Sequence, residues 1–341
     1  MNLVVCYKEG PVDEYLVEEI RAVWPEVRLI NVGQKEIADA LLEADYFCGH
    51  AKVPVDWDKI VRQNRLRWIQ SSAAGMDWCL VPSVIESEIE ITTASGALSD
   101  QVAEHALALI LASRRNLPAF FACQTEKNRV SSDYHSFKRL PTKDLTRNTV
   151  GIVGFGGVGR RLSQVLSAFQ ARILATDLFP VQKPDHVAEL WGPDRIDDLL
   201  TESDVVILCL PLNDSTRYYF DAEKFRKMKK GALLANVARG PLVRTGDLME
   251  ALENGQLCGV VVDVTDPEPL PKDHPLWDAP NVIITPHVGG QAAWRFEAIN
   301  RLFIENIKRR KAGEPMINRL SPEGKRLGFP LRNGETPLWI K

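Results

Sequence analysis

The chain has 341 residues, of which 45% are hydrophobic and 26% are charged. This composition is typical of a folded globular protein, and the length allows about two domains. Lysine and arginine number 42 against 45 aspartate and glutamate, and the net charge of −3 argues against a protein that binds nucleic acid or anionic membranes through bulk charge.

In the first third of the chain, short hydrophobic runs alternate with amphipathic stretches, which is the pattern of a parallel βαβ sheet. Strands are predicted at Leu3–Tyr7, Val27–Asn31, Tyr46–Gly49, Trp68–Ser72 and Ile89–Thr93. Helices are predicted between them at Val12–Val23, Lys35–Glu43 and Asp56–Gln63.

A long helix is predicted next at Ser99–Leu117, with Ser99 and Asp100 as candidate caps and Pro118 after its end. The regular pattern then lapses over Ala119–Arg147, where polar and aromatic residues indicate a boundary or an arm.

Further strands are predicted in the second half, and several are continuous hydrophobic runs, as expected of strands buried on both faces. They lie at Thr149–Gly154, Arg172–Asp177, Asp204–Leu210, Ala232–Val237, Cys258–Val264 and Val282–Thr285. A last amphipathic helix spans about Ala292–Lys311, and Met316–Lys341 is expected to be an extended tail.

Two basic clusters, Lys224–Lys230 and Lys308–Lys311, each end close to a glycine. We interpret both as the last turns of helices, where the helix dipole favours positive charge, and not as a polyanion site.

No hydrophobic run approaches the ~18 residues that span a bilayer, and the N-terminus lacks the basic region of a signal peptide. The six cysteines are scattered and form no CxxC pair, which favours free thiols in a reducing cytoplasm. No group of His, Cys, Asp and Glu has metal-ligand spacing, so no metal is expected.

A candidate phosphate-binding motif follows the strand predicted at Thr149–Gly154. Residues 150–159 read VGIVGFGGVG, a hydrophobic strand followed by G-x-G-x-x-G and an amphipathic helix. Gly154 allows the tight turn, Gly156 allows a pyrophosphate to approach the backbone, and Gly159 lets the helix pack against the strand. The free N–H groups near Gly157 and Val158 face the phosphate charge.

Asp177 lies 23 positions after Gly154, at the end of the next predicted strand. A carboxylate there accepts hydrogen bonds from both adenosine ribose hydroxyls and repels a 2′-phosphate. Leu178, Phe179 and Pro180 supply no arginine for such a phosphate, so NAD (NADH) is expected and NADP is less favoured.

Three later strands end in polar segments, NVARG at 236–240, DVTDPEPL at 263–270 and TPHVGG at 285–290. They place an arginine, a carboxylate and a histidine where an open α/β sheet binds ligands. Hydride transfer to a 2-keto acid needs these three groups: a guanidinium for the substrate oxygens, an imidazole for the proton, and a carboxylate to orient the imidazole.

These four motifs, in this order, resemble those of the D-isomer-specific 2-hydroxyacid dehydrogenase family, and the resemblance runs from about Trp68 to Ile317. It implies Arg239 as the substrate-binding arginine, Glu268 as the partner of the histidine, and His287 as the acid/base. Asp263 would bind the nicotinamide amide. Ala74 and Gly75, in the loop SAAG, would hold the substrate carboxylate. Further cofactor contacts are expected at Leu210, Val237, Gly289 and Gly290.

The resemblance also implies two doubly wound parallel-sheet domains with the active site in the cleft between them. The substrate domain, flavodoxin-like and discontinuous, would comprise residues 1–100 and 291–341. The NAD-binding Rossmann domain would comprise residues 101–290. Members of the family are usually dimers joined through the cofactor domain, and 119–147 matches the arm they use.

Simpler interpretations stay open for each site residue. Arg239 could form a strand-end ion pair, Glu268 could lie on the surface, and His287 could be a packing residue. His105, within a hydrophobic helix, is expected to be a hydrogen-bonded core residue. Trp78 and Trp294 would either narrow the substrate pocket or belong to the core.

The sequence thus predicts an NAD(H)-dependent reductase of small 2-keto acids such as glyoxylate or hydroxypyruvate. The alternative is an NAD(H)-sensing binding protein, because the family resembles transcriptional corepressors that keep the same three residues.

Overall fold

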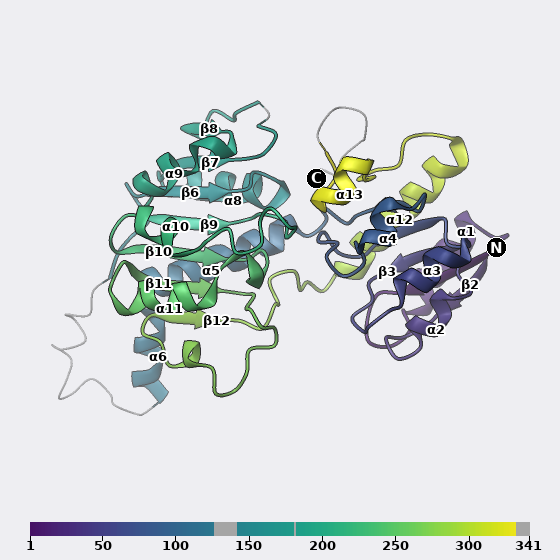
Figure 1. The fold of residues 1–341 in the computed structure, drawn as a ribbon, viewed down its shortest axis with the longest axis horizontal. Helices are drawn as coiled ribbons and strands as arrows, with labels where there is room; N and C mark the ends of the chain where they lie inside the picture. The colour runs from purple at the N-terminus through teal and green to yellow at the C-terminus, as the bar shows by residue number, and fades with distance from the viewer. Residues whose placement is uncertain (126–141, 181, 332–341) are drawn as a thin grey trace. The chain divides into compact units, whose positions relative to one another are not determined.

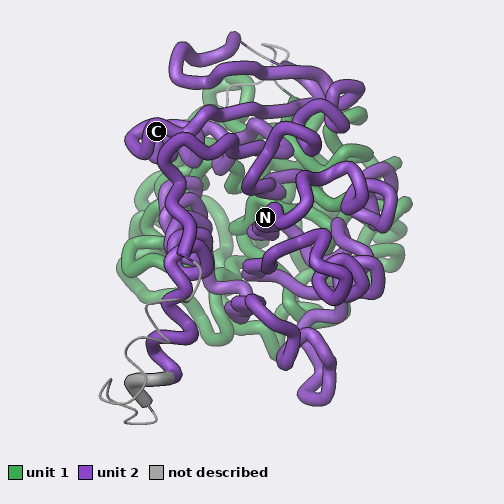
Figure 2. Tube along the Cα trace, turned by 90° about the vertical axis from the view of Figure 1, so that its left-hand side faces the viewer, with its two compact units in different colours: residues 1–98, 211–213, 291–341 green, residues 99–210, 214–290 purple. Residues whose placement is uncertain are grey.

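A computed structural model of the chain describes residues 1–125, 142–180 and 182–331. Two compact units can be distinguished in it: unit 1 comprises residues 1–98, 211–213 and 291–341, and unit 2 comprises residues 99–210 and 214–290 (Figure 2). Unit 1 contains a five-stranded sheet and unit 2 a seven-stranded sheet, and all strand pairs are parallel. The prediction of two parallel-sheet α/β domains is therefore confirmed.

The sheet of unit 1 has the strand order β2-β1-β3-β4-β5. Its strands are β1 (Asn2–Cys6), β2 (Arg28–Asn31), β3 (Tyr46–Gly49), β4 (Trp68–Ser71) and β5 (Glu90–Thr92). Its helices are α1 (Glu14–Val23), α2 (Ile37–Leu41), α3 (Trp57–Gln63), α4 (Pro82–Glu86), α12 (Arg295–Ala312) and α13 (Pro322–Leu327).

Helices cover both faces of this sheet, and successive side chains of a strand point to opposite faces, so both sets are buried. Leu3 and Val5 of β1 pack in one hydrophobic cluster with residues of α1 and α12. Val4 and Cys6 pack in another cluster with residues of α2 and α3. Continuous hydrophobic runs are what such a strand requires, which is why the sequence pattern located it.

The segment after α12 was expected to be an extended tail, and for residues 316–331 this is wrong. Met316, Ile317 and Leu320 are buried, and the Leu320 amide donates to the Ile91 carbonyl oxygen at 2.8 Å. The segment then forms α13, whose cap Ser321 accepts from the Gly324 amide. Hydrophobic residues spaced irregularly around Pro and Gly gave no periodic signal, although they pack on unit 1. Residues 332–341 lie outside the described part of the chain.

The sheet of unit 2 has the order β12-β11-β10-β9-β6-β7-β8 (Figure 1). Its strands are β6 (Thr149–Val153), β7 (Arg172–Thr176), β8 (Glu189–Trp191), β9 (Val205–Leu208), β10 (Ala232–Asn236), β11 (Leu257–Val262) and β12 (Val282–Ile284). Its helices are α5 (Ser99–Arg114), α6 (Leu117–Thr125), α8 (Gly157–Ser167), α9 (Ile196–Glu202), α10 (Ala222–Lys227) and α11 (Thr245–Glu253), with short 3₁₀ turns at Pro193–Arg195, Gly240–Leu242 and Pro275–Trp277.

Helices cover both faces of this sheet, as a doubly wound fold requires. On one face α5 and α8 pack together over a core that includes Ala106, Ile110 and Leu162 (Figure 1). Helices α9, α10 and α11 follow the strands that they connect and pack against one another in sequence order.

The long helix expected at Ser99–Leu117 is broken in the structure. α5 ends at Arg114, Asn116 adopts a left-handed conformation with φ +55, and α6 begins at Leu117 with Pro118 in its first turn. Proline fits the first turn of a new helix, where its missing N–H costs no hydrogen bond. The region in which the regular pattern was expected to end, from residue 119, therefore begins within a helix. Most of the predicted arm, residues 126–141, lies outside the described residues.

Each of the two basic clusters contains the last turn of a helix, as expected, although Lys229 and Lys230 lie beyond α10. Lys224, Arg226 and Lys227 occupy the last turn of α10, and Arg309, Arg310 and Lys311 the last turn of α12. Within the described ranges, no helix is both long enough and apolar enough to cross a membrane.

Candidate active site

Four predicted site segments meet one edge of the sheet of unit 2. The glycine motif follows β6, Arg239 follows β10, Glu268 follows β11 and His287 follows β12. Because all these strands are parallel, their carboxyl ends lie at the same edge. From β6 the sheet extends through β7 to β8 on one side, and the chain then returns to β9 on the other side of β6. The strand order therefore reverses between β6 and β9, and open α/β sheets bind ligands at such a switch point.

The glycine loop needs glycine for geometric reasons at two positions. Gly154 has φ +97, and a Cβ there would lie 2.7 Å from the carbonyl oxygen of Cys209 at the end of β9. A Cβ at Gly159 would lie 2.2 Å from the Gly154 carbonyl oxygen. The first glycine therefore makes the turn across the switch point, and the third lets α8 approach β6.

Asp177, directly after β7, is tied to this loop. Its Oδ2 accepts a hydrogen bond from the Phe155 amide at 2.7 Å, and its Oδ1 accepts one from the Phe179 amide at 3.0 Å. The carboxylate is therefore held beside the glycine turn, and each oxygen keeps a further lone pair for a ligand hydroxyl.

These residues fit a dinucleotide. Gly156 precedes α8, Gly157 and Val158 open it, and the first amides of a helix have no partner within it. A glycine loop without side chains, helix amides and an adjacent carboxylate are the groups that a pyrophosphate and a ribose require. Leu210 is the second residue after β9 and Val237 the first residue after β10, on the same edge.

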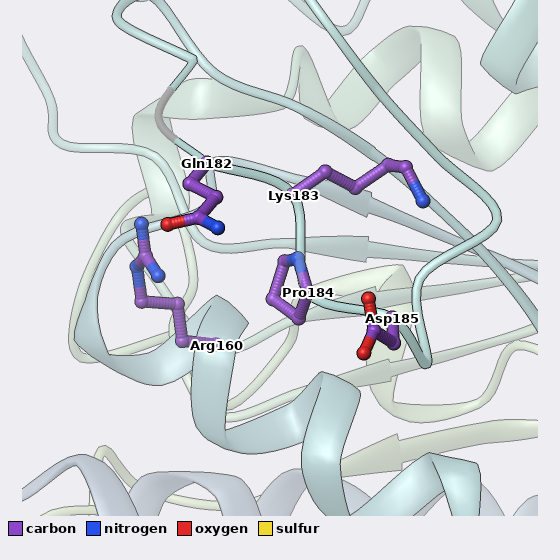
Figure 3. Close-up of a pocket in the computed structure, with 5 residues that line it drawn as sticks. All are labelled: Arg160, Gln182, Lys183, Pro184 and Asp185. Atoms are coloured by element: carbon purple, nitrogen blue, oxygen red, sulfur yellow. The ribbon is translucent and has the colours of Figure 1, made fainter.

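A hollow of about 460 Å³ lies next to the start of α8 and contains none of the three predicted catalytic residues. Arg160, Gln182, Lys183, Pro184 and Asp185 line it, and the side chains of Arg160 and Gln182 lie next to each other there (Figure 3). The Arg160 guanidinium also stacks over the Phe155 ring, 5.2 Å from its centroid. Arg160 is not among the predicted site residues, because a phosphate-binding cation is expected from sequence only directly after Asp177.

Arg239 lies in a turn held by Asn236, a buried residue at the end of β10. The Asn236 side chain donates to the Arg239 carbonyl oxygen at 2.8 Å and accepts from the Ala238 amide at 3.1 Å. The Arg239 guanidinium donates to the Ala238 carbonyl oxygen at 2.8 Å. Asn236 is not among the predicted site residues, although a polar side chain at the last position of a hydrophobic strand is informative.

His287 and Glu268 are in direct contact. His287 Nδ1 lies 2.7 Å from Glu268 Oε1, and the two side chains are 45% and 41% exposed. Since a carboxylate accepts, Nδ1 carries the proton of this hydrogen bond, and Nε2 is the ring nitrogen left for a ligand. An exposed imidazole in this arrangement does not pack a core, so the geometry favours a chemical role over a packing role.

The turn that carries His287 is bound to Asp263. The amides of His287, Val288 and Gly289 donate to the main-chain oxygen, Oδ1 and Oδ2 of Asp263 at 2.8, 2.9 and 2.8 Å respectively. The Asp263 side chain is only 4% exposed. Gly290 is the next residue along this turn.

His105 on α5 is hydrogen-bonded, as expected from its place in a hydrophobic helix. Its Nε2 lies 2.9 Å from Thr285 Oγ1, and Thr285 in turn donates to Asp263 Oδ1 at 2.6 Å. Thr285 is not among the predicted site residues, because no local sequence pattern connects two residues 180 positions apart.

The remaining predicted substrate residues belong to unit 1. Ala74 and Gly75 follow β4 in a loop where Ser71 Oγ accepts from the Ala73 amide at 3.0 Å. Trp78 packs against the core of unit 1 and stacks on His50 with ring centroids 4.8 Å apart, while Trp294 is 39% exposed. In the part of the chain that the structure describes, no three His, Cys, Asp or Glu side chains are grouped to hold a metal.

Comparison with known proteins identifies the family. Residues 107–289 match the family model for the NAD-binding domain of D-isomer specific 2-hydroxyacid dehydrogenases. The chain is 31% identical to a glyoxylate reductase of Thermococcus kodakarensis over 313 residues, which is 90% of this chain and 92% of that protein.

Two solved structures have the same fold over nearly their full length. The TT0316 protein of Thermus thermophilus is 29% identical, with a TM-score of 0.77 over 94% of this chain and 100% of that one. A D-isomer specific 2-hydroxyacid dehydrogenase from Xanthobacter autotrophicus, in complex with NADPH and MES, is 25% identical with a TM-score of 0.75 over 95% of this chain and 99% of that one. The chain therefore belongs to the D-isomer specific 2-hydroxyacid dehydrogenase family, as its motifs indicated, and is an oxidoreductase acting on CH–OH groups.

Proposed function

We propose that this protein is an NAD(H)-dependent reductase that converts a small 2-keto acid, such as glyoxylate or hydroxypyruvate, to the D-2-hydroxy acid. The observation that carries the proposal is the 2.7 Å hydrogen bond between His287 Nδ1 and Glu268 Oε1 at an exposed strand end. The 31% identity to a glyoxylate reductase supports the substrate class.

In this mechanism Glu268 accepts a hydrogen bond from the Nδ1–H group of His287 and thereby orients the ring. His287 Nε2 then donates a proton to the C2 oxygen of the keto acid. A nicotinamide cofactor, which the glycine loop and Asp177 would hold, would supply the hydride to C2, so that the keto acid, NADH and one proton give the hydroxy acid and NAD⁺. Arg239 binds the substrate carboxylate and C2 oxygen through its planar guanidinium.

The reaction is tested with purified protein, NADH and a panel of small 2-keto acids, by following the NADH absorbance. We expect oxidation of NADH with glyoxylate or hydroxypyruvate. His287→Ala should lower kcat by at least about 10²-fold, the lower end of the contribution of a general acid. Binding of NADH to this variant, measured by fluorescence, should stay close to that of the wild-type protein.

Two results would contradict the proposal. A His287→Ala variant with the wild-type rate removes His287 from the mechanism. NADH binding without turnover of any keto acid favours the alternative, a cofactor-sensing protein of the same fold.

The preference for NADH over NADPH belongs to this proposal and rests on the carboxylate of Asp177 beside the glycine loop. The hollow that Arg160 and Lys183 help to line is the feature that opposes it. Lys183 Nζ is bound to the Val187 carbonyl oxygen at 2.7 Å, so this cation already has a structural partner. We therefore expect the effect of Asp177 to dominate.

We also propose that the protein forms a homodimer through unit 2 and works in a reducing compartment, the cytoplasm. Helix α6, which leads into residues 126–141, has the apolar sequence LPAFFACQT, and Phe121 is 59% exposed. The five described cysteines are free thiols. Sedimentation velocity at micromolar protein is expected to show a species of twice the chain mass.

A further inference from the structure

The position of His287 depends on Asp263. Three successive amides, those of His287, Val288 and Gly289, donate to this one residue, and His287 adopts φ +55, a conformation that a non-glycine residue seldom takes without support. Whatever fixes the Asp263 carboxylate therefore also fixes the backbone from which the imidazole projects.

The carboxylate is fixed by a chain of two hydrogen bonds. Thr285 Oγ1 donates its single proton to Asp263 Oδ1 at 2.6 Å, so towards His105 Nε2, 2.9 Å away, it can only accept. His105 must then carry a proton on Nε2. The same nitrogen lies 3.3 Å from Asp263 Oδ1.

The turn closes tightly over these groups. A Cβ at Gly289 would lie 2.9 Å from Asp263 Oδ2 and 3.3 Å from His105 Cδ2. The His105 side chain is 22% exposed, and Ala106 and Leu109 of the same helix belong to the hydrophobic core of unit 2. The buried part of a polar ring is costly unless it is hydrogen-bonded.

We infer that His105 and Thr285 are positioning residues of the dehydrogenase, which act on His287 through Asp263. The chain His105–Thr285–Asp263 holds the 287–289 turn so that Nδ1 of His287 stays on Glu268 and Nε2 stays aimed at the substrate oxygen. The inference rests on the proposed role of His287 as the acid.

The test uses paired substitutions in the full-length protein. Thr285→Val and His105→Leu remove the hydrogen bonds, whereas Thr285→Ser keeps the hydroxyl and His105→Gln can place an amide N–H near the position of Nε2. The matched control is His186→Leu, because His186 Nε2 makes the same kind of bond to Ser163 Oγ, at 3.0 Å, elsewhere in unit 2.

Two readouts are measured well below the melting temperature. With saturating NADH and keto acid, kcat should fall by about tenfold in Thr285→Val and His105→Leu, which corresponds to the loss of a single well-placed hydrogen bond. In Thr285→Ser and His105→Gln, kcat should lie within about threefold of the wild-type value, and in His186→Leu it should equal the wild-type value. Hydrogen exchange of the amides of residues 287–289 should accelerate in the first two variants only.

The outcomes separate this inference from the proposed function. Faster exchange in a protein whose wild-type form reduces no keto acid supports the positioning chain and rejects the reductase. Unchanged exchange and unchanged kcat in Thr285→Val overturn the inference while the reductase stands. If His105→Leu does not fold, Thr285→Val carries the test, since it replaces a hydroxyl by a methyl group of similar size.

Discussion

Two carboxylates of unit 2, Asp177 and Asp263, each hold the backbone of a loop that follows a strand. Asp177 holds the amides of Phe155 and Phe179, and Asp263 holds the turn of His287. A carboxylate accepts up to about four hydrogen bonds, so the two backbone donors of Asp177 leave capacity for a ligand. The Asp263 carboxylate also accepts from Thr285 Oγ1, and its side chain is only 4% exposed. Replacing either residue consequently changes both the local charge and the geometry of a loop.

The choice of cofactor is a prediction at this scale. Asp177→Ala should lower the ratio of kcat/KM for NADH to that for NADPH by at least about tenfold, because the carboxylate no longer repels a 2′-phosphate and no longer binds the ribose. The measurement is steady-state kinetics with both cofactors.

Asp185→Asn is the control for this experiment. Like Asp177→Ala it removes one negative charge, but Asp185 lines the hollow near α8 and does not bind the glycine loop. It should leave the ratio within about twofold of the wild-type value. An equal effect of both substitutions would mean that general charge, and not the position of Asp177, sets the preference. Adding Arg160→Ala to Asp177→Ala should then reduce the use of NADPH if the hollow receives the 2′-phosphate.

At the scale of elements, the junction of β6 and α8 depends on the absence of a side chain. Gly159→Ala would place a methyl group 2.2 Å from the Gly154 carbonyl oxygen, an atom of the backbone that cannot turn away. We expect a loss of about 3 kcal/mol or more in the free energy of unfolding, as for a severely overpacked site. Urea denaturation with and without NADH measures it.

Gly246→Ala is the matched control, because Gly246 lies in the first turn of α11 and a Cβ there meets nothing within 4 Å. Alanine should stabilise this helix by up to about 1 kcal/mol. If both variants were equally stable, close packing at Gly159 would not be what demands glycine.

Elements with a strong local signal could be predicted from the sequence. Buried strands such as β9 are continuous hydrophobic runs, whereas β8 (Glu189–Trp191) is short, partly exposed and has no run to detect. The glycine motif and the segments of Arg239, Glu268 and His287 were found because each directly follows such a strand. The hydrogen bond between His105 and Thr285 could not be predicted from the sequence, since it depends on how α5 packs on the sheet.

At the scale of the whole molecule, unit 1 contains buried ionisable groups that stay neutral when folded. Burial raises the pKa of Cys6 to about 11, and burial also raises the pKa values of Cys48 and Cys79. Burial, followed by the contact with Cys48, also raises the pKa of Tyr7. The Tyr7 hydroxyl lies 3.2 Å from Cys48 Sγ and donates to Asn300 Oδ1, so this neutral pair joins β1, β3 and α12.

Stability should therefore fall in alkaline solution. In the unfolded chain a thiol ionises near pH 9, so above that pH unfolding releases protons. Each buried thiol then lowers the free energy of unfolding by about 1.4 kcal/mol per pH unit, until the pH reaches the pKa of that thiol in the folded protein. We expect the melting temperature to drop between pH 8 and pH 10, measured by circular dichroism. Cys48→Ser should show a smaller drop, and an equal drop would mean that Cys48 does not titrate on unfolding.

The segment beyond α12 also determines how the sheet of unit 1 ends. β5 is an outer strand of this sheet, and the Leu320 amide and the Asn318 carbonyl oxygen bond to the main chain on either side of Thr92, at Ile91 and Thr93. An outer strand left open is a template on which other chains can add, and natural proteins cover it. A chain shortened before Met316 would lose this cover and become prone to aggregate, so the C-terminal residues protect the solubility of a domain whose first strand is formed by the opposite end of the chain.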